Sequence, residues 1–174
     1  MTFGLCKGID DITTKAEIRI RAANAQDAAA IFRLLEEVAG EIPVLLDLPE
    51  RRSKIEEIVR VRCDAGESWV AASDDLRVIG FLLVEPDQIE RFHHDNGALH
   101  LAYAGVPADC RGRGVFRALV GKAMTRNVPL TATVKRNNQA AMRQRLLNYG
   151  FVVVSATEDQ ESLRWTPPKN DAHR

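Results

Sequence analysis

The stretch of sequence that most constrains the fold is VPADCRGRGVFRAL, residues 106–119. An apolar, strand-like segment precedes it and apolar residues at helical spacing follow it, so it is expected to connect a strand to a helix. The first backbone N–H groups of a helix have no partner inside the helix, and the helix dipole adds partial positive charge at that end. Such a connection is suited to binding an anion.

The residues within this stretch favour a phosphate or pyrophosphate as that anion. Gly112 and Gly114 allow a ligand to approach the main chain closely, and Arg111, Arg113 and Arg117 carry full positive charges. The spacing excludes two other phosphate-binding loops, because it contains neither G-x-x-x-x-G-K-S/T nor G-x-G-x-x-G. A strand–glycine–helix turn also occurs as simple punctuation of a fold, so a purely structural role stays open.

The distribution of charge along the chain supports an anionic partner for this region. The 174 residues contain 24 Lys and Arg and 24 Asp and Glu, so the formal net charge is zero. Residues 1–109 hold 20 acidic and 12 basic side chains, whereas residues 110–157 hold nine basic side chains and no acidic one. This asymmetry indicates a charged partner, although solvated helix faces can also cluster by chance.

The residues before the loop predict one strand, two helices and three further strands. Residues 17–21 alternate as a half-buried strand does. A helix begins near Asn24, whose side chain can cap it with Asp27 three residues on, and a second helix runs from near Pro49 to near Gly66. Short turns join the three further strands into an antiparallel meander over residues 68–72, 77–84 and 98–106.

After the loop, the sequence predicts a helix, a strand, a helix and a closing hairpin. Residues 129–134 form a strand that the intervening helix places parallel to the strand at 98–106. Asn138 can cap the last helix, which stops at Gly150. Residues 151–155 and 161–165 form the hairpin. The fold class is therefore α/β, a single domain around a mixed, mostly antiparallel sheet of about seven strands with a central parallel pair.

Length and composition limit the kind of protein. A chain of 174 residues with 45% hydrophobic residues supports one domain with a substantial core. We expect a leader at residues 1–16, the domain over 17–165 and a flexible tail at 166–174. No apolar run is long enough to span a bilayer or to act as a secretory signal. Three cysteines far apart in the chain favour a reducing, cytoplasmic compartment.

Residues 106–119 resemble motif A of the GNAT superfamily of acyl-coenzyme A N-acyltransferases, Q/R-x-x-G-x-G/A. Arg111 takes the first position, Gly114 the fourth and Phe116 the sixth. Phe116 departs from the Gly or Ala that the family prefers, so the loop is expected to be more crowded there. The resemblance extends through the order of helices and strands and through a second signature around Asn138, Ala141, Gly150 and Phe151.

This resemblance implies acetyl-coenzyme A (acetyl-CoA) as co-substrate. Its pyrophosphate would lie at the loop and its pantetheine arm along the backbone of the preceding strand. The strands at 98–106 and 129–134 would separate to hold the thioester. The implied reaction is direct transfer of the acetyl group to a primary amine of a small molecule or peptide. The residues implied in binding acetyl-CoA are Ala104, Val106, Arg111, Gly112, Arg113, Gly114, Val115, Phe116 and Asn138.

Acyl transfer to an amine needs a base for the attacking nitrogen and a proton for the leaving thiolate. In family members whose base comes from the strand before the loop, it lies eleven residues before motif A, a position that His100 occupies here. An imidazole titrates near neutrality and can take that proton. Glu85, at the end of the preceding strand, is a second candidate base. A packed His100 and a solvent-exposed Glu85 without catalytic roles are the alternatives.

The tyrosine that usually serves as acid in the last helix of the family is absent at its expected place. That place falls on Arg145 or Leu146, depending on the end from which the helix is counted. Tyr149 lies seven residues after Met142, and this spacing favours packing in the core. The thiolate could instead take its proton from solvent or be held by a backbone N–H.

The acceptor and the other partners are less constrained. Nine acidic side chains over residues 36–67 would suit a cationic amine, although acids are also normal on exposed helix faces. A non-catalytic acyl-CoA-binding or regulatory domain is the alternative function. Nucleic acid is not expected, because no aromatic interleaving or helix-turn-helix pattern accompanies the basic segment. No metal site is expected, since His93, His94 and Asp95 are adjacent in a turn and adjacent residues seldom bind one ion. No membrane partner is expected, and a homodimer is one open assembly state.

Overall fold

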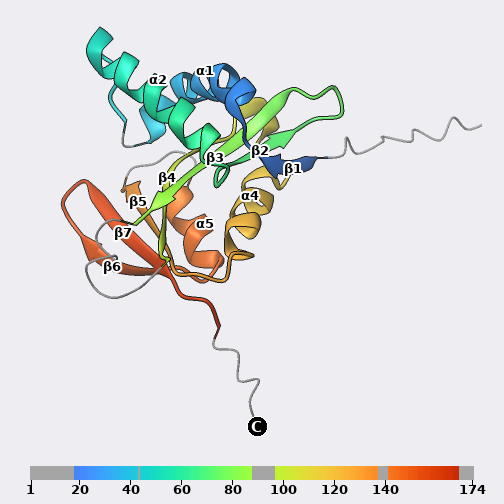
Figure 1. The fold of residues 1–174 in the computed structure, drawn as a ribbon. Coiled ribbons are helices and arrows are strands. Elements are labelled where there is room, and N and C mark those ends of the chain that lie inside the picture. The colour runs from blue at the N-terminus through green and yellow to red at the C-terminus, as the bar shows by residue number, and fades with distance from the viewer. Residues whose placement is uncertain (1–17, 43, 88–96, 137–140, 169–174) are drawn as a thin grey trace, which may run out of the picture.

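The computed structural model describes residues 18–42, 44–87, 97–136 and 141–168. One seven-stranded sheet runs through it in the order β1-β2-β3-β4-β5-β7-β6 (Figure 1). The strands are β1 (Arg19–Ala22), β2 (Trp69–Ala72), β3 (Val78–Pro86), β4 (Leu99–Gly105), β5 (Leu130–Lys135), β6 (Val152–Ala156) and β7 (Gln160–Trp165). The α-helices within these ranges are α1 (Ala28–Val38), α2 (Pro49–Asp64), α4 (Val115–Met124) and α5 (Met142–Asn148). None of them has the length and apolar character needed to cross a membrane.

The sheet is mixed, as the sequence predicts. Every neighbouring pair of strands is antiparallel except β4 and β5, which are parallel because α4 connects them. The α/β fold class, the number of strands and the central parallel pair are thereby confirmed. The final hairpin also forms, with β7 rather than β6 pairing with β5, so that β6 lies at the edge of the sheet.

The first helix begins at the predicted cap. The Asn24 side chain accepts a hydrogen bond from the backbone N–H of Gln26 at 2.9 Å, and the Asp27 carboxylate accepts one from the backbone N–H of Asn24 at 3.0 Å. This capping box opens a short 3-10 turn that leads into α1. Arg21 of β1 donates two hydrogen bonds of 2.7 Å to the same carboxylate and so ties the strand to the start of the helix.

The last helix ends at the predicted glycine. Gly150 has a φ of +89°, and its N–H donates to the carbonyl of Leu147 at 2.9 Å, while that of Phe151 donates to Leu146 at 3.1 Å. These bonds satisfy carbonyls that the helix end leaves free. Asn138, which the sequence suggests as the cap of this helix, lies outside the described residues, and α5 begins at Met142.

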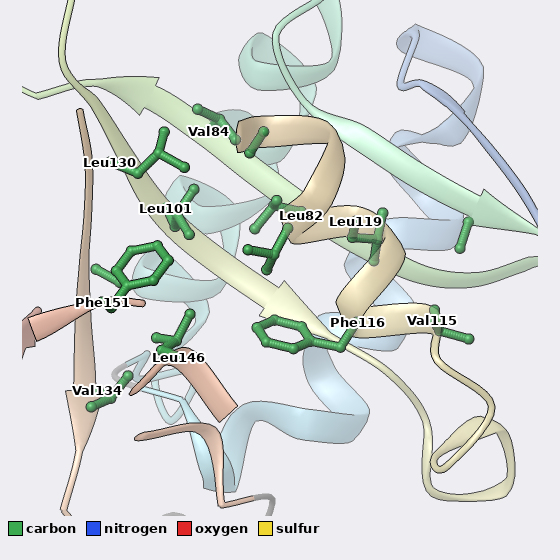
Figure 2. Close-up of a cluster of buried hydrophobic side chains, with 14 of the residues drawn as sticks. Leu82, Val84, Leu101, Val115, Phe116, Leu119, Leu130, Val134, Leu146 and Phe151 are labelled. Atoms are coloured by element: carbon green, nitrogen blue, oxygen red, sulfur yellow. The ribbon is translucent and has the colours of Figure 1, made fainter. Parts of the chain in front are cut away.

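Two apolar clusters lie on opposite faces of the sheet, because successive residues of a strand point to opposite sides. Phe81 and Leu83 of β3 pack with α1 and α2 on one face. Leu82 and Val84 of the same strand pack with α4 and α5 on the other (Figures 1 and 2). The apolar residues of β3 and β4 thus contribute to both cores.

Strand β4 is irregular on both of its sides. Leu83 of β3 lies opposite Tyr103 and the next residue, Val84, lies opposite Leu101, so Ala102 is an extra residue, a β-bulge. On its other side β4 pairs with β5 only as far as Leu101 opposite Ala132. Beyond that pair the two strands separate, as the resemblance to the GNAT family implies.

Gly105 ends β4 at a point where no side chain fits. A Cβ on this residue would lie 2.6 Å from Cε1 of Phe81 and 2.9 Å from Cγ2 of Val38. The glycine therefore allows the end of α1 to cross β4 closely. This crossing brings the connection after α1 next to the loop that precedes α4.

Candidate functional site

The backbone conformation of the loop between β4 and α4 depends on two glycines. Gly112 and Gly114 have φ values of +79° and +82°, in the left-handed region that other residues adopt at a cost of about 1–2 kcal/mol. Gly114 is also the N-cap of α4. A Cβ at either glycine would meet no other atom within 4 Å. The space in front of the helix N-terminus is therefore left open toward solvent.

The three arginines of the loop differ in their surroundings. Arg111 turns back on its own loop, where Nε donates to the carbonyl of Val106 at 3.0 Å and Nη2 donates to the Glu41 carboxylate at 2.8 Å. Arg113 and Arg117 are exposed and form no ion pair within the described ranges. The free positive charge at the loop therefore comes from Arg113 and Arg117, whereas Arg111 holds the loop in shape.

A pocket of about 600 Å³, counting the space open to solvent, lies at this loop. Seven of the nine residues implied in binding acetyl-CoA line it, which places the loop and the end of β4 around one cavity. Arg113 does not line it, and Asn138 lies outside the described residues. The seven are Ala104, Val106, Arg111, Gly112, Gly114, Val115 and Phe116.

A second pocket, of about 440 Å³ on the same measure, occupies the gap between β4 and β5. Its walls include Leu101–Ala104 of β4 and Ala132–Lys135 of β5. The two pockets have five residues in common, so they adjoin and form one path from the loop into the separated strands. These five are Glu41, Ile42, Ala104, Phe116 and Met142.

Phe116 lies where the two pockets meet. Its side chain is only 7% exposed and points from the first turn of α4 toward Leu146 (Figure 2). Its ring centroid is 6.1 Å from that of Tyr149, which lines the first pocket and packs against the core, as its helical spacing predicts. The extra bulk of Phe116 therefore narrows the junction of the pockets and leaves Gly112 and Gly114 unobstructed.

His100 lies at the closed end of the gap and lines neither pocket. It is half-buried on β4, directly before the pocket residues Leu101 and Ala102. Its Nδ1 lies 2.9 Å from the hydroxyl oxygen of Thr131, its partner on β5. Burial lowers the pKa of His100, although the charges of Asp87 and Glu85 act in the opposite direction. The imidazole is thus favoured in its neutral form, which can accept a proton.

Glu85 lies directly opposite His100 in the register of β3 and β4. Its carboxylate forms an ion pair with Arg62 of α2 and is therefore engaged with a cation. Glu85 lines neither pocket. The two candidate bases are thus neighbours on the α2 side of the sheet, beside the gap rather than within it.

Sequence periodicity misses one side chain near this pair. In a regular strand, two residues that are three positions apart point to opposite faces of the sheet, so Tyr103 would be expected on the face away from His100. The bulge at Ala102 reverses the expected orientation of Tyr103. The β3 partner of His100 is Glu85 and that of Tyr103 is Leu83, and these two partners are two residues apart and so lie on the same face of β3. Tyr103 therefore lies on the same face as His100 and lines the second pocket. Burial, with the charge of Glu85, raises its pKa.

Four of the nine acidic residues around the first two helices are paired with arginines. Glu36 pairs with Arg52, Asp47 with Arg51, Glu41 with Arg111 and Glu67 with Arg126. The strong negative charge that the sequence indicates for residues 36–67 is thereby reduced at four positions. Glu41 is the one of these four that lines the pockets.

Within the described residues, no three His, Cys, Asp or Glu side chains gather as metal ligands would. His93, His94 and Asp95 lie outside that part of the chain. Cys63 and Cys110 are free thiols, and both are buried. The ionisable side chains that line the two pockets are Glu41, Cys110, four basic residues and two tyrosines, and His100 lies beside the gap. The basic residues are Arg111, Arg117, Lys135 and Arg145, and the tyrosines are Tyr103 and Tyr149.

Comparison with known proteins gives matches to solved structures. No family model and no curated protein matches the chain. A GCN5-related N-acetyltransferase from Kribbella flavida is 22% identical, with a TM-score of 0.66, over 87% of this chain and 98% of its own. The diaminobutyrate acetyltransferase EctA from Paenibacillus lautus, in complex with L-2,4-diaminobutyric acid and coenzyme A, is 17% identical, with a TM-score of 0.65, over 87% and 96%. NAA60 from Arabidopsis thaliana, in complex with acetyl-CoA, is 17% identical, with a TM-score of 0.65, over 86% and 99%.

These structures define the class of fold. The chain has the fold of the GNAT N-acetyltransferases, with the parallel strand pair and the strand–loop–helix connection in the places that residues 106–119 imply. It spans nearly the whole length of each of the three solved structures.

Proposed function

We propose that the protein is an acetyl-CoA-dependent N-acetyltransferase that acetylates a primary amine of a small molecule or peptide. The observation that carries this proposal is the path formed by the two adjoining pockets, from the glycine loop at the N-terminus of α4 into the gap between β4 and β5. An elongated ligand with an anionic end and a reactive far end matches this path. Two of the similar structures contain acetyl-CoA or coenzyme A.

The residues of the first pocket suit the anionic end of acetyl-CoA. The backbone N–H groups at the start of α4 would hold the pyrophosphate, since a helix N-terminus favours negative charge. Arg113 and Arg117 are exposed beside it, and neither has its charge neutralised by a described acid. Ala104 and Val106 would lie along the pantetheine arm, on the edge of β4 that β5 leaves unpaired.

His100 is the proposed base, and Glu85 is the second candidate for that role. The amine nitrogen forms a bond to the acetyl carbonyl carbon, the carbon–sulfur bond breaks, and the nitrogen loses a proton, which His100 accepts directly or through a water molecule, since it lies beside the gap. The leaving thiolate takes up a proton from solvent. Burial lowers the pKa of His100, so the imidazole is in the neutral form that a base requires at neutral pH.

A non-catalytic acyl-CoA-binding domain is the second candidate function. Leu146, at one of the two expected places of the family's acidic tyrosine, is only 2% exposed within the core and has no proton to donate. Arg145, at the other place, lines the first pocket but stays protonated in proteins. This domain would bind acetyl-CoA without releasing free coenzyme A when amines are added.

The test combines binding with turnover. Calorimetric titration of the full chain with acetyl-CoA should give one site, and saturating acetyl-CoA should raise the melting temperature, because a ligand that binds only the folded state stabilises it. Release of coenzyme A is then measured with a panel of diamines, amino acids and peptides. Binding with turnover supports the enzyme, and binding without turnover supports the non-catalytic domain. Absence of binding would overturn both.

A further inference from the structure

A chain of hydrogen bonds crosses three neighbouring strands at the closed end of the gap. His100 of β4 and Thr131 of β5 lie opposite each other, with 2.9 Å between Nδ1 and Oγ1. The Thr131 hydroxyl also donates to the carboxylate of Asp87, which follows β3 and is only 7% exposed. The sequence gives no sign of these hydrogen bonds, because the three residues come from segments that meet only in the folded sheet.

The chemistry of the three groups determines the direction of each bond. An ionised carboxylate can only accept, so the single hydroxyl proton of Thr131 is directed to Asp87. Toward His100 the Thr131 oxygen can then only accept, and the imidazole must donate from Nδ1–H. In a neutral imidazole with a protonated Nδ1, the lone pair is on Nε2. Within the described residues, Nε2 makes no hydrogen bond.

We infer that Thr131 and Asp87 are positioning residues that hold His100 in the Nδ1–H tautomer, so that Nε2 is the nitrogen that takes the proton of the acceptor amine. This inference rests on the proposed function for its catalytic consequence. The tautomer itself is a property of the folded protein and can be measured without any substrate.

The arrangement suits a base because it needs no rearrangement during proton transfer. Before transfer, His100 donates from Nδ1–H to Thr131, and Nε2 is free. After Nε2 has gained the proton, the imidazolium still donates from Nδ1–H, and the Thr131 hydroxyl still donates to Asp87. The negative charge of Asp87, relayed through the polarised hydroxyl, favours the imidazolium at that stage, as a carboxylate does in a Ser-His-Asp triad.

Other charged groups face His100 and must be separated from this effect. Glu85 lies opposite it on β3 and is paired with Arg62 of α2, and Tyr103 lies on the same face of β4. A change in Glu85 or Arg62 would alter the charge near the imidazole without removing its partner at Nδ1. Thr131 is uncharged, so its substitution tests the hydrogen bond itself.

The direct test is nuclear magnetic resonance of the protein labelled with ¹⁵N in its histidine rings. Spectra recorded at pH 8 distinguish protonated from unprotonated ring nitrogens, and His100→Gln assigns the signals of His100. We expect a protonated Nδ1 and an unprotonated Nε2 in the wild-type protein. Thr131→Val, which keeps the shape of the side chain, should lose this pattern, and Thr131→Ser should keep it. A wild-type spectrum with the proton on Nε2 would overturn the inference and needs no variant to fold.

Kinetics test the catalytic consequence. Thr131→Val should lower kcat about 100-fold, the lower end of the usual effect of general base catalysis, with little change in the KM for acetyl-CoA. Thr131→Ser should restore most of kcat. If Thr131→Val stays folded, loses the tautomer and keeps its kcat, the positioning role is refuted while the acetyltransferase proposal stands. If the wild-type protein neither binds acetyl-CoA nor releases coenzyme A, the proposed function fails together with the catalytic consequence, and the spectra still decide the tautomer.

Discussion

Arg111 and Glu41 are joined across the candidate site although 70 residues separate them in the chain. Nη2 of Arg111, in the loop before α4, donates a hydrogen bond of 2.8 Å to Oε1 of Glu41, in the connection after α1. Both residues line the first pocket. The pair links the loop proposed to bind the pyrophosphate to the side of the site that α1 and α2 form.

This pair predicts an effect of Glu41 on affinity. The Glu41 carboxylate places negative charge beside an anion site and occupies one arm of Arg111. We expect Glu41→Gln to tighten acetyl-CoA binding two- to fivefold, equivalent to about 0.5–1 kcal/mol for a partly exposed ion pair. The measurement is calorimetric titration at low and at high salt, and the gain should shrink as salt screens the charges. Glu67→Gln, which breaks the pair with Arg126 away from the pockets, is the control. Equal changes in both variants would contradict the prediction.

The glycine at the N-cap of α4 predicts a loss of binding without a loss of fold. Gly114→Val places a β-branched side chain at a φ of +82°, at a cost of about 2 kcal/mol, and fills the open space before the helix. Gly66→Val is a matched control, because Gly66 has a φ of +70°, also has open space and lies away from the pockets at the end of α2. We expect similar decreases in melting temperature for both variants. Only Gly114→Val should lose the stabilisation by acetyl-CoA, with affinity at least about tenfold weaker.

The buried imidazole predicts the direction of a pH dependence. Burial lowers the pKa of His100 in the folded state below the ordinary 6.5. At a pH between the folded and the unfolded pKa of His100, the unfolded chain binds more protons than the folded protein. The free energy of unfolding therefore falls as the pH decreases through 6.5 and levels off below the folded pKa. Urea unfolding between pH 7.5 and 5 should show this fall in the wild-type protein, and His100→Gln should lack that component. An equal or steeper fall in His100→Gln would contradict the prediction. The acidic limb of kcat should lie below pH 6.5 for the same reason.

The buried carboxylate at the start of α1 predicts a separate effect at lower pH. Hydrogen bonds from Arg21 lower the pKa of Asp27 below its ordinary 3.8, so its contribution to stability is full above that value and is lost as the pH falls through the folded pKa. Asp27→Asn should cost about 2 kcal/mol at pH 7, measured by urea unfolding. Asp47→Asn, in an exposed pair with Arg51, should cost about 0.3–0.5 kcal/mol. A smaller effect for Asp27 than for Asp47 would refute the assignment.

The buried thiols predict slow chemical modification. Cys63 is 1% exposed, and burial, with the nearby charges of Asp27 and Asp64, raises its pKa to about 11. Because the thiolate is the reactive form, Cys63 should react with iodoacetamide at pH 8 at least about 100-fold more slowly in the native than in the denatured protein. Peptide mass spectrometry measures each site. Cys110, equally buried in the wall of the first pocket, should behave likewise. Rapid labelling of native Cys63 would contradict the packing of α2 on the sheet.

The prediction of the fold from sequence succeeded because its signals are local. Asn24 and Asp27 are three residues apart, and a capping box needs no other part of the chain. Gly150 stops α5 by a backbone conformation that it adopts alone. Apolar periodicity gave the helices and strands to within a few residues, and the helix between two strands required β4 and β5 to be parallel.

The candidate site was only partly accessible to the same reasoning. The glycine loop was visible because Gly112 and Gly114 lie within one short connection whose backbone defines it. The engagement of Arg111 by Glu41 was not visible, because a pair separated by 70 residues leaves no local pattern. The arginine partners of the acids around α1 and α2 were missed for the same reason.

The sequence by itself determined the order of the elements, the parallel strand pair and the glycine loop, since each depends on residues close together in the chain. Only the tertiary structure decided which side chains meet. The bulge at Ala102 brings Tyr103 to the face of His100, and the alignment of three strands places Thr131 between His100 and Asp87. Strand register is set by packing on both faces of the sheet, and a shift of one residue reverses every side chain. The chemistry of the site therefore depends on a register that local sequence does not encode.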